Sequence, residues 1–150
     1  MFTEAIEKIL SDLCTPARVR AVESADSATT LWSALEDSGF LELLTPEVAG
    51  GAGLALDALL PIFVAFGRCA LPVPAAQSMA ARALMRDCPS APPSGMLTLA
   101  GTAHRQPDGL LCVPRVAFGL MADFALVNLE GQLLLLDCSL ARRQPTGVHG

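Results

Sequence analysis

The chain has 150 residues, enough for one ordinary domain or two small ones, and a formal net charge of −5. Its ten basic residues are mostly Arg and are scattered along the sequence, which excludes the basic stripe of a nucleic-acid-binding protein and predicts solvated surface charges. Apolar residues make up 52% of the chain and 12 more are Gly, together roughly 60% against a usual ~45–50%. Either the composition is biased toward Ala and Leu, or a partner surface covers the excess.

The sequence predicts neither a membrane span nor a secretory signal. The longest uncharged apolar run, residues 58–67, contains Pro61 and is far shorter than the ~18–20 residues of a span. The N-terminus has no basic region, so no secretory signal is predicted. The cysteines are odd in number and lack C-x-x-C spacing, so we expect small buried thiols in a reducing cytoplasm and no zinc site. They are Cys14, Cys69, Cys88, Cys112 and Cys138.

The first half of the sequence has a helical apolar period. It predicts a helix from residue 2 to just before Pro16, capped by Thr3, and a second from about 30 to 38, stopped by a left-handed Gly39. Two further helices are predicted at about 56–68 and 75–87. Pro61 must lie near the first turn of the former or kink it. The residues expected to be mostly buried are Ile6, Ile9, Leu13, Leu35, Phe40 and Phe63, with Trp32 as a core anchor.

The sequence changes character near residues 89–95, after which the apolar runs become short and β-like. Four strands are predicted, at residues 96–100, 110–116, 124–129 and 132–137. Asp108-Gly109 and Glu130-Gly131 are tight-turn signals, and the latter suits a hairpin. Helices followed by strands indicate an α+β fold: an N-terminal all-helical domain over 1–91 and a partial antiparallel β-domain over 92–150.

No motif in the sequence specifies a catalytic centre. Gly50-Gly51-Ala52-Gly53 lacks the register and the Lys of a phosphate-binding loop, so a flexible turn is the better interpretation. His104 is interpreted as a solvated loop residue, and His149 lies at the C-terminal end. No activated nucleophile or carboxylate pair stands out.

Several segments in order resemble the acyl-CoA dehydrogenase family. An aromatic-apolar helix and Gly over residues 31–40 precede Pro46-Glu47-Val48-Ala49-Gly50-Gly51-Ala52-Gly53-Leu54, which is similar to the family's Pro-Glu-x-x-Gly-Gly-x-Gly-Leu. Gly67-Arg68 and Pro72-Val73-Pro74 continue the likeness. Residues 121–127, with Ala122-Asp123, are similar to a strand of the family's middle β-domain.

The resemblance implies a three-domain enzyme of fatty acid metabolism that uses FAD to desaturate an acyl-CoA between its α and β carbons. In the family, flavin and thioester lie between the β-domain and a C-terminal helical bundle, which usually supplies a glutamate base. Base and flavin must face the substrate from opposite sides, so separate elements have to provide them.

Two departures from the family affect the expected site. With Ala122-Asp123 aligned, the family's flavin-facing Trp falls on Arg115 and its hydroxyl residue on Ala117, and neither side chain makes the usual contact. The segment that should read Thr-Glu-Pro and Gly-Ser-Asp does not, which leaves Leu99 and Thr102 as the candidate cofactor contacts there. The sequence shows about four strands and no bundle, so it offers no catalytic residue.

The first hypothesis is therefore a partial or divergent acyl-CoA dehydrogenase-type flavoprotein chain. FAD and acyl-CoA belong to the complete enzyme, and this chain alone is expected to retain no FAD. The alternative is a non-catalytic subunit that pairs with a complete dehydrogenase partner. A third hypothesis is a nucleotide-binding module that uses the glycine turn. An incomplete β-domain leaves strand edges uncovered, so a homo- or hetero-oligomer is expected.

Overall fold

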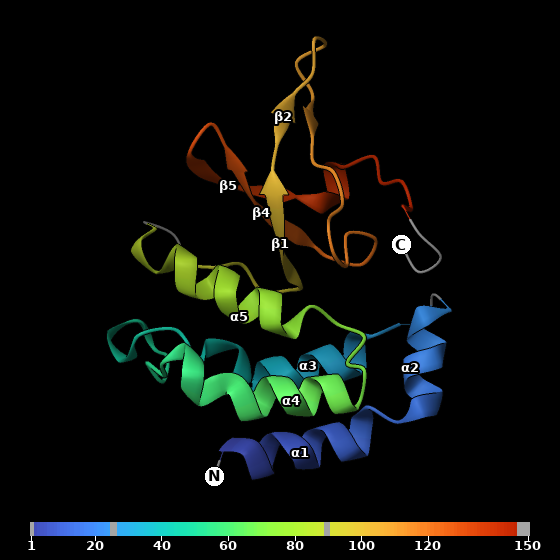
Figure 1. The fold of residues 1–150 in the computed structure, drawn as a ribbon, viewed down its shortest axis with the longest axis vertical. Coiled ribbons are helices and arrows are strands. Elements are labelled where there is room, and N and C mark those ends of the chain that lie inside the picture. Colours follow the sequence, from blue (N-terminus) through green and yellow to red (C-terminus); the bar gives the residue numbers. More distant parts are fainter. Residues whose placement is uncertain (1, 25–26, 89–90, 147–150) are drawn as a thin grey trace.

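The computed structural model describes residues 2–24, 27–88 and 91–146. Helices occupy the first part of the chain and strands the second, so the predicted α+β class is confirmed. The helices form a stack, and the strands lie beyond α5 at the other end of the molecule (Figure 1). The α-helices are α1 Phe2–Leu13, α2 Pro16–Glu23, α3 Thr29–Asp37, α4 Leu60–Arg68 and α5 Ala75–Leu84. Short 3₁₀ helices span Phe40–Glu42, Glu47–Ala49, Leu56–Leu59, Met85–Asp87 and Cys138–Leu140.

The four predicted helices are present, and α2 is an additional one. Pro16 begins α2 as well as ending the segment of α1, because a Pro at the first helical position lacks only a donor that would have no partner there. The Thr15 hydroxyl caps α2 by accepting from the Arg18 amide at 3.3 Å. The cap predicted at Thr3 is wrong, since Thr3 lies inside α1.

The predicted helix ends are borne out by the backbone angles. Gly39 has a φ of 75°, the left-handed conformation that ends α3. The helix predicted over 56–68 is divided into the 3₁₀ helix Leu56–Leu59 and α4, with Pro61 in the first turn of α4.

The β-part contains one sheet of order β1-β4-β5 and one two-stranded sheet. The strands are β1 Leu97–Thr102, β2 His104–Arg105, β3 Leu111–Cys112, β4 Phe124–Leu129 and β5 Gln132–Asp137. β4 and β5 form the predicted hairpin, whose turn residues Glu130 and Gly131 both have positive φ. β1 pairs with β4 in parallel, so the sheet is mixed rather than antiparallel throughout. The segment between β1 and β4 carries the β2–β3 hairpin and returns the chain to the start of the sheet.

The hydrophobic core is centred on the helices. Of the predicted core residues, Ile6, Leu35 and Phe40 are buried, whereas Ile9, Leu13 and Phe63 are partly buried against them. Trp32 is buried, as expected of a core anchor. The buried members of this cluster also include Leu31, Leu41, Leu59, Ile62, Phe66, Val73 and Met79.

The described residues contain neither a membrane-spanning helix nor a candidate metal-binding cluster. None of the helices there combines the length and apolar character that crossing a bilayer requires. The same residues contain no cluster of His, Cys, Asp or Glu suited to a metal ion.

Candidate functional site

The glycine-rich segment is a tightly packed turn. The amides of Gly51, Ala52 and Gly53 donate to the carbonyls of Pro46, Glu42 and Thr45, so they are not free to bind a phosphate. A Cβ at Gly51 would collide with the Thr45 backbone, which explains why Gly is needed there. These contacts favour neither the nucleotide-binding hypothesis nor a flexible turn.

Ser78 joins the helices to the first strand. Its hydroxyl, fully buried on α5, donates to the Leu97 carbonyl at 2.6 Å, and the Leu97 amide lies 3.1 Å from the same oxygen. One side chain thereby satisfies both backbone groups of a buried residue of β1. The start of β1 is fixed to α5 by this contact.

Arg82 holds the same junction together electrostatically. Its Nη1 donates to Glu42 Oε1 at 2.6 Å and its Nη2 to Glu36 Oε1 at 2.9 Å, and Glu36 Oε1 also accepts from the Gly95 amide. The guanidinium is buried, while both carboxylates keep some exposure. Arg82 was predicted to be a solvated surface charge, and that prediction is wrong. The ion pairs link α5 to α3 and to the 3₁₀ helix Phe40–Glu42, and the Gly95 amide adds the segment before β1, so the cluster has a structural role.

The Ala122-Asp123 match also serves the junction. Asp123 Oδ2 accepts from the Met96 amide at 2.8 Å, directly before β1. Gly95 has a φ of 117°, and a Cβ on it would lie 2.8 Å from Asp123 Oδ2. The Gly and Asp side by side therefore define how the chain enters β1.

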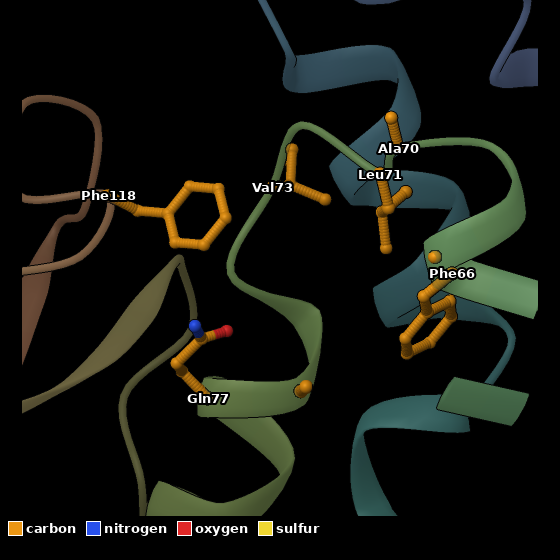
Figure 2. Close-up of a pocket in the computed structure, with 8 residues that line it drawn as sticks. Phe66, Ala70, Leu71, Val73, Gln77 and Phe118 are labelled. Atoms are coloured by element: carbon orange, nitrogen blue, oxygen red, sulfur yellow. The ribbon is translucent and has the colours of Figure 1, made fainter. Parts of the chain in front are cut away.

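A cavity of about 260 Å³ lies where the helices meet the β-part. It is lined by Phe66, Gly67, Ala70, Leu71, Val73, Ala76, Gln77 and Phe118. Figure 2 shows Phe118 reaching from the β-part toward Val73 and Gln77, with Phe66 and Leu71 on the far side. The volume falls just below the ~300–1,000 Å³ of ordinary ligand pockets, so this cavity is better described as part of a site.

This cavity is called the interdomain cavity after the two predicted domains, and its lining suits binding rather than acid–base chemistry. All its side chains are apolar except that of Gln77, whose amide can both donate and accept a hydrogen bond. No acid, base or thiol is among the lining residues. The arrangement can hold an apolar group and orient one polar atom of it.

Backbone strain marks the same cavity. Among the described non-glycine residues, positive φ occurs at Ala70, Arg115, Phe118 and Glu130, and the first and third of these line the cavity. Such conformations persist only where packing enforces them, and they concentrate at functional sites. These conformations could not be predicted from the sequence, because neither Ala nor Phe favours a left-handed backbone.

The residues predicted to contact the cofactor are only partly brought together. The Thr98 hydroxyl donates to the Ala117 carbonyl at 2.7 Å and holds that loop against β1, the strand that carries half-buried Leu99. Thr102 is exposed at the far end of β1, and Arg115 is exposed with a φ of 53°. Ala117 offers no hydroxyl and Arg115 no aromatic face, so these side chains do not fit a flavin ring.

The described histidine and cysteine residues do not line the interdomain cavity. His104 is exposed, as expected, but it belongs to β2 rather than to a loop. His149 lies outside the described residues. Hydrogen bonds from Ser139 lower the pKa of Asp137, and burial raises the pKa of the Cys138 thiol. Cys14 and Cys138 are buried, whereas Cys88 and Cys112 are exposed, which contradicts the expectation of uniformly buried thiols.

Comparison with known proteins gives matches to solved structures alone. No protein-family model and no curated protein matches the sequence. A variant of the Tcur3481–Tcur3483 steroid ACAD, an acyl-CoA dehydrogenase, is 28% identical with a TM-score of 0.67 over 90% of this chain and 46% of the solved chain. The ChsE4–ChsE5 complex from Mycobacterium tuberculosis is 20% identical with a TM-score of 0.59, over 90% and 45% of the respective chains.

These matches agree with the segments that resemble the family in the sequence. The chain spans less than half the length of the solved chains that it matches. The expected resemblance is confirmed: the fold of this chain is similar to part of an acyl-CoA dehydrogenase chain.

Proposed function

We propose that this chain is a component of an FAD-dependent acyl-CoA dehydrogenase-type flavoprotein and is not catalytically competent alone. The observation that carries the proposal is the coverage: nine-tenths of this chain superpose on less than half of a steroid ACAD chain. The rest of the dehydrogenase fold, which carries the flavin contacts and the catalytic base, then comes from a continuation of this chain or from a partner chain. The reaction of the complete assembly is the α,β-desaturation of an acyl-CoA.

The interdomain cavity supports a role in holding the acyl group. Its walls are apolar, and Gln77 supplies the single polar contact. The steroid ACAD among the solved relatives makes a bulky apolar acyl group the substrate class to test first. The lining has no base, and a missing positioned base typically lowers the rate by ~10²–10⁴-fold.

This chain supplies few of the contacts that a bound flavin needs. A flavin ring placed against Arg115 would require its guanidinium to be desolvated or turned away, at a considerable free-energy cost. Ala117 cannot donate a hydrogen bond from its side chain. We therefore propose that FAD is retained only after other polypeptide contributes most of its contacts.

Two uncovered surfaces support a protein partner. β5 is an edge strand, and the hairpin register turns the amides of Leu133, Leu135 and Asp137 away from β4. Leu133 is 54% exposed. In the described part of the chain, β5 therefore presents an apolar residue together with unpaired backbone groups at the edge of the sheet. The second surface is a stripe of exposed Leu56, Leu60 and Val64 along α4 and the turn before it.

The alternative, a non-catalytic subunit beside a complete dehydrogenase, is favoured by a specific observation. The names of both solved relatives join two components, Tcur3481 with Tcur3483 and ChsE4 with ChsE5. The DNA downstream of the Gly150 codon separates the two versions. Continuation into a dehydrogenase C-terminal region indicates one long enzyme, and a stop indicates a subunit.

The first experiment tests the chain alone. We expect the purified protein to be colourless and to remain without bound flavin after excess FAD is added and removed. With acyl-CoA and an artificial electron acceptor, no turnover is expected above the background. A bound-flavin spectrum together with turnover would overturn the proposal of an incomplete enzyme.

The second experiment tests the cavity in the completed assembly, obtained by expressing the chain with its continuation or partner. Gln77→Leu should raise the KM for a bulky acyl-CoA about 5–10-fold, the effect of losing one hydrogen bond. Gln106→Leu, at an exposed turn, should leave KM unchanged. Equal KM values for both variants would show that the cavity is not part of the substrate-binding site.

A further inference from the structure

A second cavity, of about 220 Å³, opens beside the C-terminal end of α4 and brings two cysteines together. Cys14 comes from the corner between α1 and α2, and Cys69 directly follows α4. The remaining lining residues are Glu7, Leu10, Ser11, Ala65 and Arg68. The two cysteines are 55 residues apart in the sequence, so the tertiary fold alone makes them neighbours.

The hydrogen bonds of the two thiols place the Cys14 side chain against the Cys69 backbone. The Cys14 thiol donates to the Cys69 carbonyl, with a sulfur-to-oxygen distance of 3.5 Å, and the Cys69 thiol donates to the Phe66 carbonyl at 3.4 Å. Cys14 is 6% exposed, and Cys69 is partly exposed to the cavity. Burial, followed by the neighbouring Cys69 thiol, raises the pKa of Cys14 to about 12.

We propose that Cys14 and Cys69 form a reversible thiol-modification site, in which a low-molecular-weight disulfide such as oxidised glutathione converts the pair into an internal disulfide. Neither the family resemblance nor the proposed function is needed for this inference. It rests on two cysteines that line one surface cavity, one buried and one partly exposed, with the Cys14 sulfur 3.5 Å from the Cys69 carbonyl oxygen. In a reducing compartment such disulfides are transient and serve redox sensing.

The reaction proceeds in two balanced steps. The Cys69 thiolate attacks one sulfur of oxidised glutathione, the glutathione disulfide breaks, and one glutathione thiolate leaves and takes up a proton. Cys14 then loses its proton to solvent and attacks the Cys69 sulfur, forming the internal bond and expelling the second glutathione. Two protein thiols are oxidised, and one oxidised glutathione is reduced to two thiols.

The order of attack follows from exposure and charge. Cys69 reacts first because it is the more exposed of the two cysteines that line the cavity. Cys14 reacts second, and its high pKa makes the closing step dependent on hydroxide. The charged groups that face the cavity are Glu7 of α1 and Arg68 of α4, which pair with each other at 3.6 Å on the exposed surface. Because Cys14 attacks as its thiolate, the closing rate should rise with pH.

The modification site and the interdomain cavity share one short segment. Phe66, Gly67, Ala70 and Leu71 line the interdomain cavity, while Ala65, Arg68 and Cys69 line the cysteine cavity. Oxidation removes the thiol proton that Cys69 donates to the Phe66 carbonyl. The internal disulfide would thus join the end of α1 to the end of α4. It would also remove a hydrogen bond to the backbone of Phe66, which lines the interdomain cavity.

The test uses the full chain, reduced, then exposed to oxidised glutathione and analysed by mass spectrometry. We expect a cross-linked peptide pair that contains Cys14 and Cys69, with a mass two hydrogen atoms below that of the two reduced peptides together. Cys14→Ser should stop with one glutathione attached at Cys69. Cys112→Ser, which removes an exposed thiol, should still form the internal bond. The melting temperature of the oxidised chain should rise by roughly 5–15 °C.

Two results would overturn the proposal. One is the accumulation of glutathione on Cys69 in the unsubstituted chain at pH 9 without closure to Cys14. The other is disulfide formation confined to bonds between chains through Cys88 or Cys112. Both readouts come from the unsubstituted chain, so they stay decisive even if a Cys14 variant fails to fold.

Discussion

The helical part and the β-part of this chain differ in how much of their own core they contain. Twenty of the described residues form one buried cluster, all but Met96 from the helical part, and Leu35 is among its fully buried members. The strands contribute two small clusters, each with four buried members. One of these, around Leu97 and Leu126, needs Ala81 and Met85 from α5 and its 3₁₀ extension. The helical part is thus complete around its own core, whereas the sheet depends on α5 at one end and is uncovered at the other.

The contrast separates the part of the sheet that is anchored to the helices from the part that is left unpaired at its edge. β1 is fixed to α5 by the Ser78 hydroxyl and to Asp123 by the Met96 amide. β5, two strands away, has β4 as its single neighbour among the described strands. Stability should therefore decrease from the helices across the sheet to β5.

The largest expected effect tests the two cores directly. Leu35→Ala should lower the free energy of unfolding by ~2–5 kcal/mol, because Leu35 is fully buried and leaves a cavity. Leu133→Ala, on the exposed edge of β5, should change it by less than ~0.5 kcal/mol. Urea unfolding followed by circular dichroism measures both. Similar losses for the two variants would remove the contrast.

The second prediction concerns the junction between the two parts. Arg82→Ala should cost about 1–3 kcal/mol, because it leaves Glu36 and Glu42 without their shared cation. This range is reduced for the partial exposure of both carboxylates. Arg86→Ala, at an exposed pair with Asp87, is the matched control and should cost less than ~0.5 kcal/mol. An Arg82 loss no larger than the Arg86 loss would mean that the junction is held by packing alone.

A smaller effect of opposite sign is expected within α4. Gly67 lies in the helix with a negative φ, and nothing lies within 4 Å of a Cβ added there. Gly67→Ala should raise the free energy of unfolding by ~0.4–1 kcal/mol, because Ala reduces the entropy of the unfolded chain. Thermal unfolding checks this. A destabilised Gly67→Ala variant would show that α4 is more crowded than the structure indicates.

The smallest expected effect lies at the end of β5. Because Ser139 donates to the Asp137 carboxylate, the pKa of Asp137 is lowered. A lowered pKa stabilises the fold above the ordinary Asp value, and this contribution is lost as the pH falls through the folded-state pKa. NMR titration should give an Asp137 midpoint below that of a model peptide, and Ser139→Ala should raise it. An unchanged midpoint would exclude the Ser139 side chain as a cause.

Local features of the fold could be predicted from the sequence, and features set by tertiary contacts could not. The apolar period of α1, the stop at Gly39 and the Glu130-Gly131 turn depend on neighbouring residues and were right. The short helix α2 was missed because it has little apolar periodicity, and the parallel pairing of β1 with β4 is a non-local choice. Arg82 looked like a surface charge because Glu36 and Glu42 are far from it in sequence.

The same distinction applies to the candidate site. The family resemblance located the glycine turn and Ala122-Asp123, which prove to be structural. The interdomain cavity was not foreseen, since Phe118 meets Val73 and Gln77 only through the fold. The predicted cofactor contacts at Leu99, Thr102, Arg115 and Ala117 remain predictions.

Hydrogen exchange of backbone amides tests most directly the claim that the helical part is complete and the sheet is not. In the isolated chain, amides of α3 and α4 should be the most protected, while the outward amides of Leu133, Leu135 and Asp137 exchange quickly. Addition of the partner or continuation should protect those three amides and leave α3 unchanged. Protection of the β5 edge equal to that of α4 in a monomeric isolated chain would contradict the account.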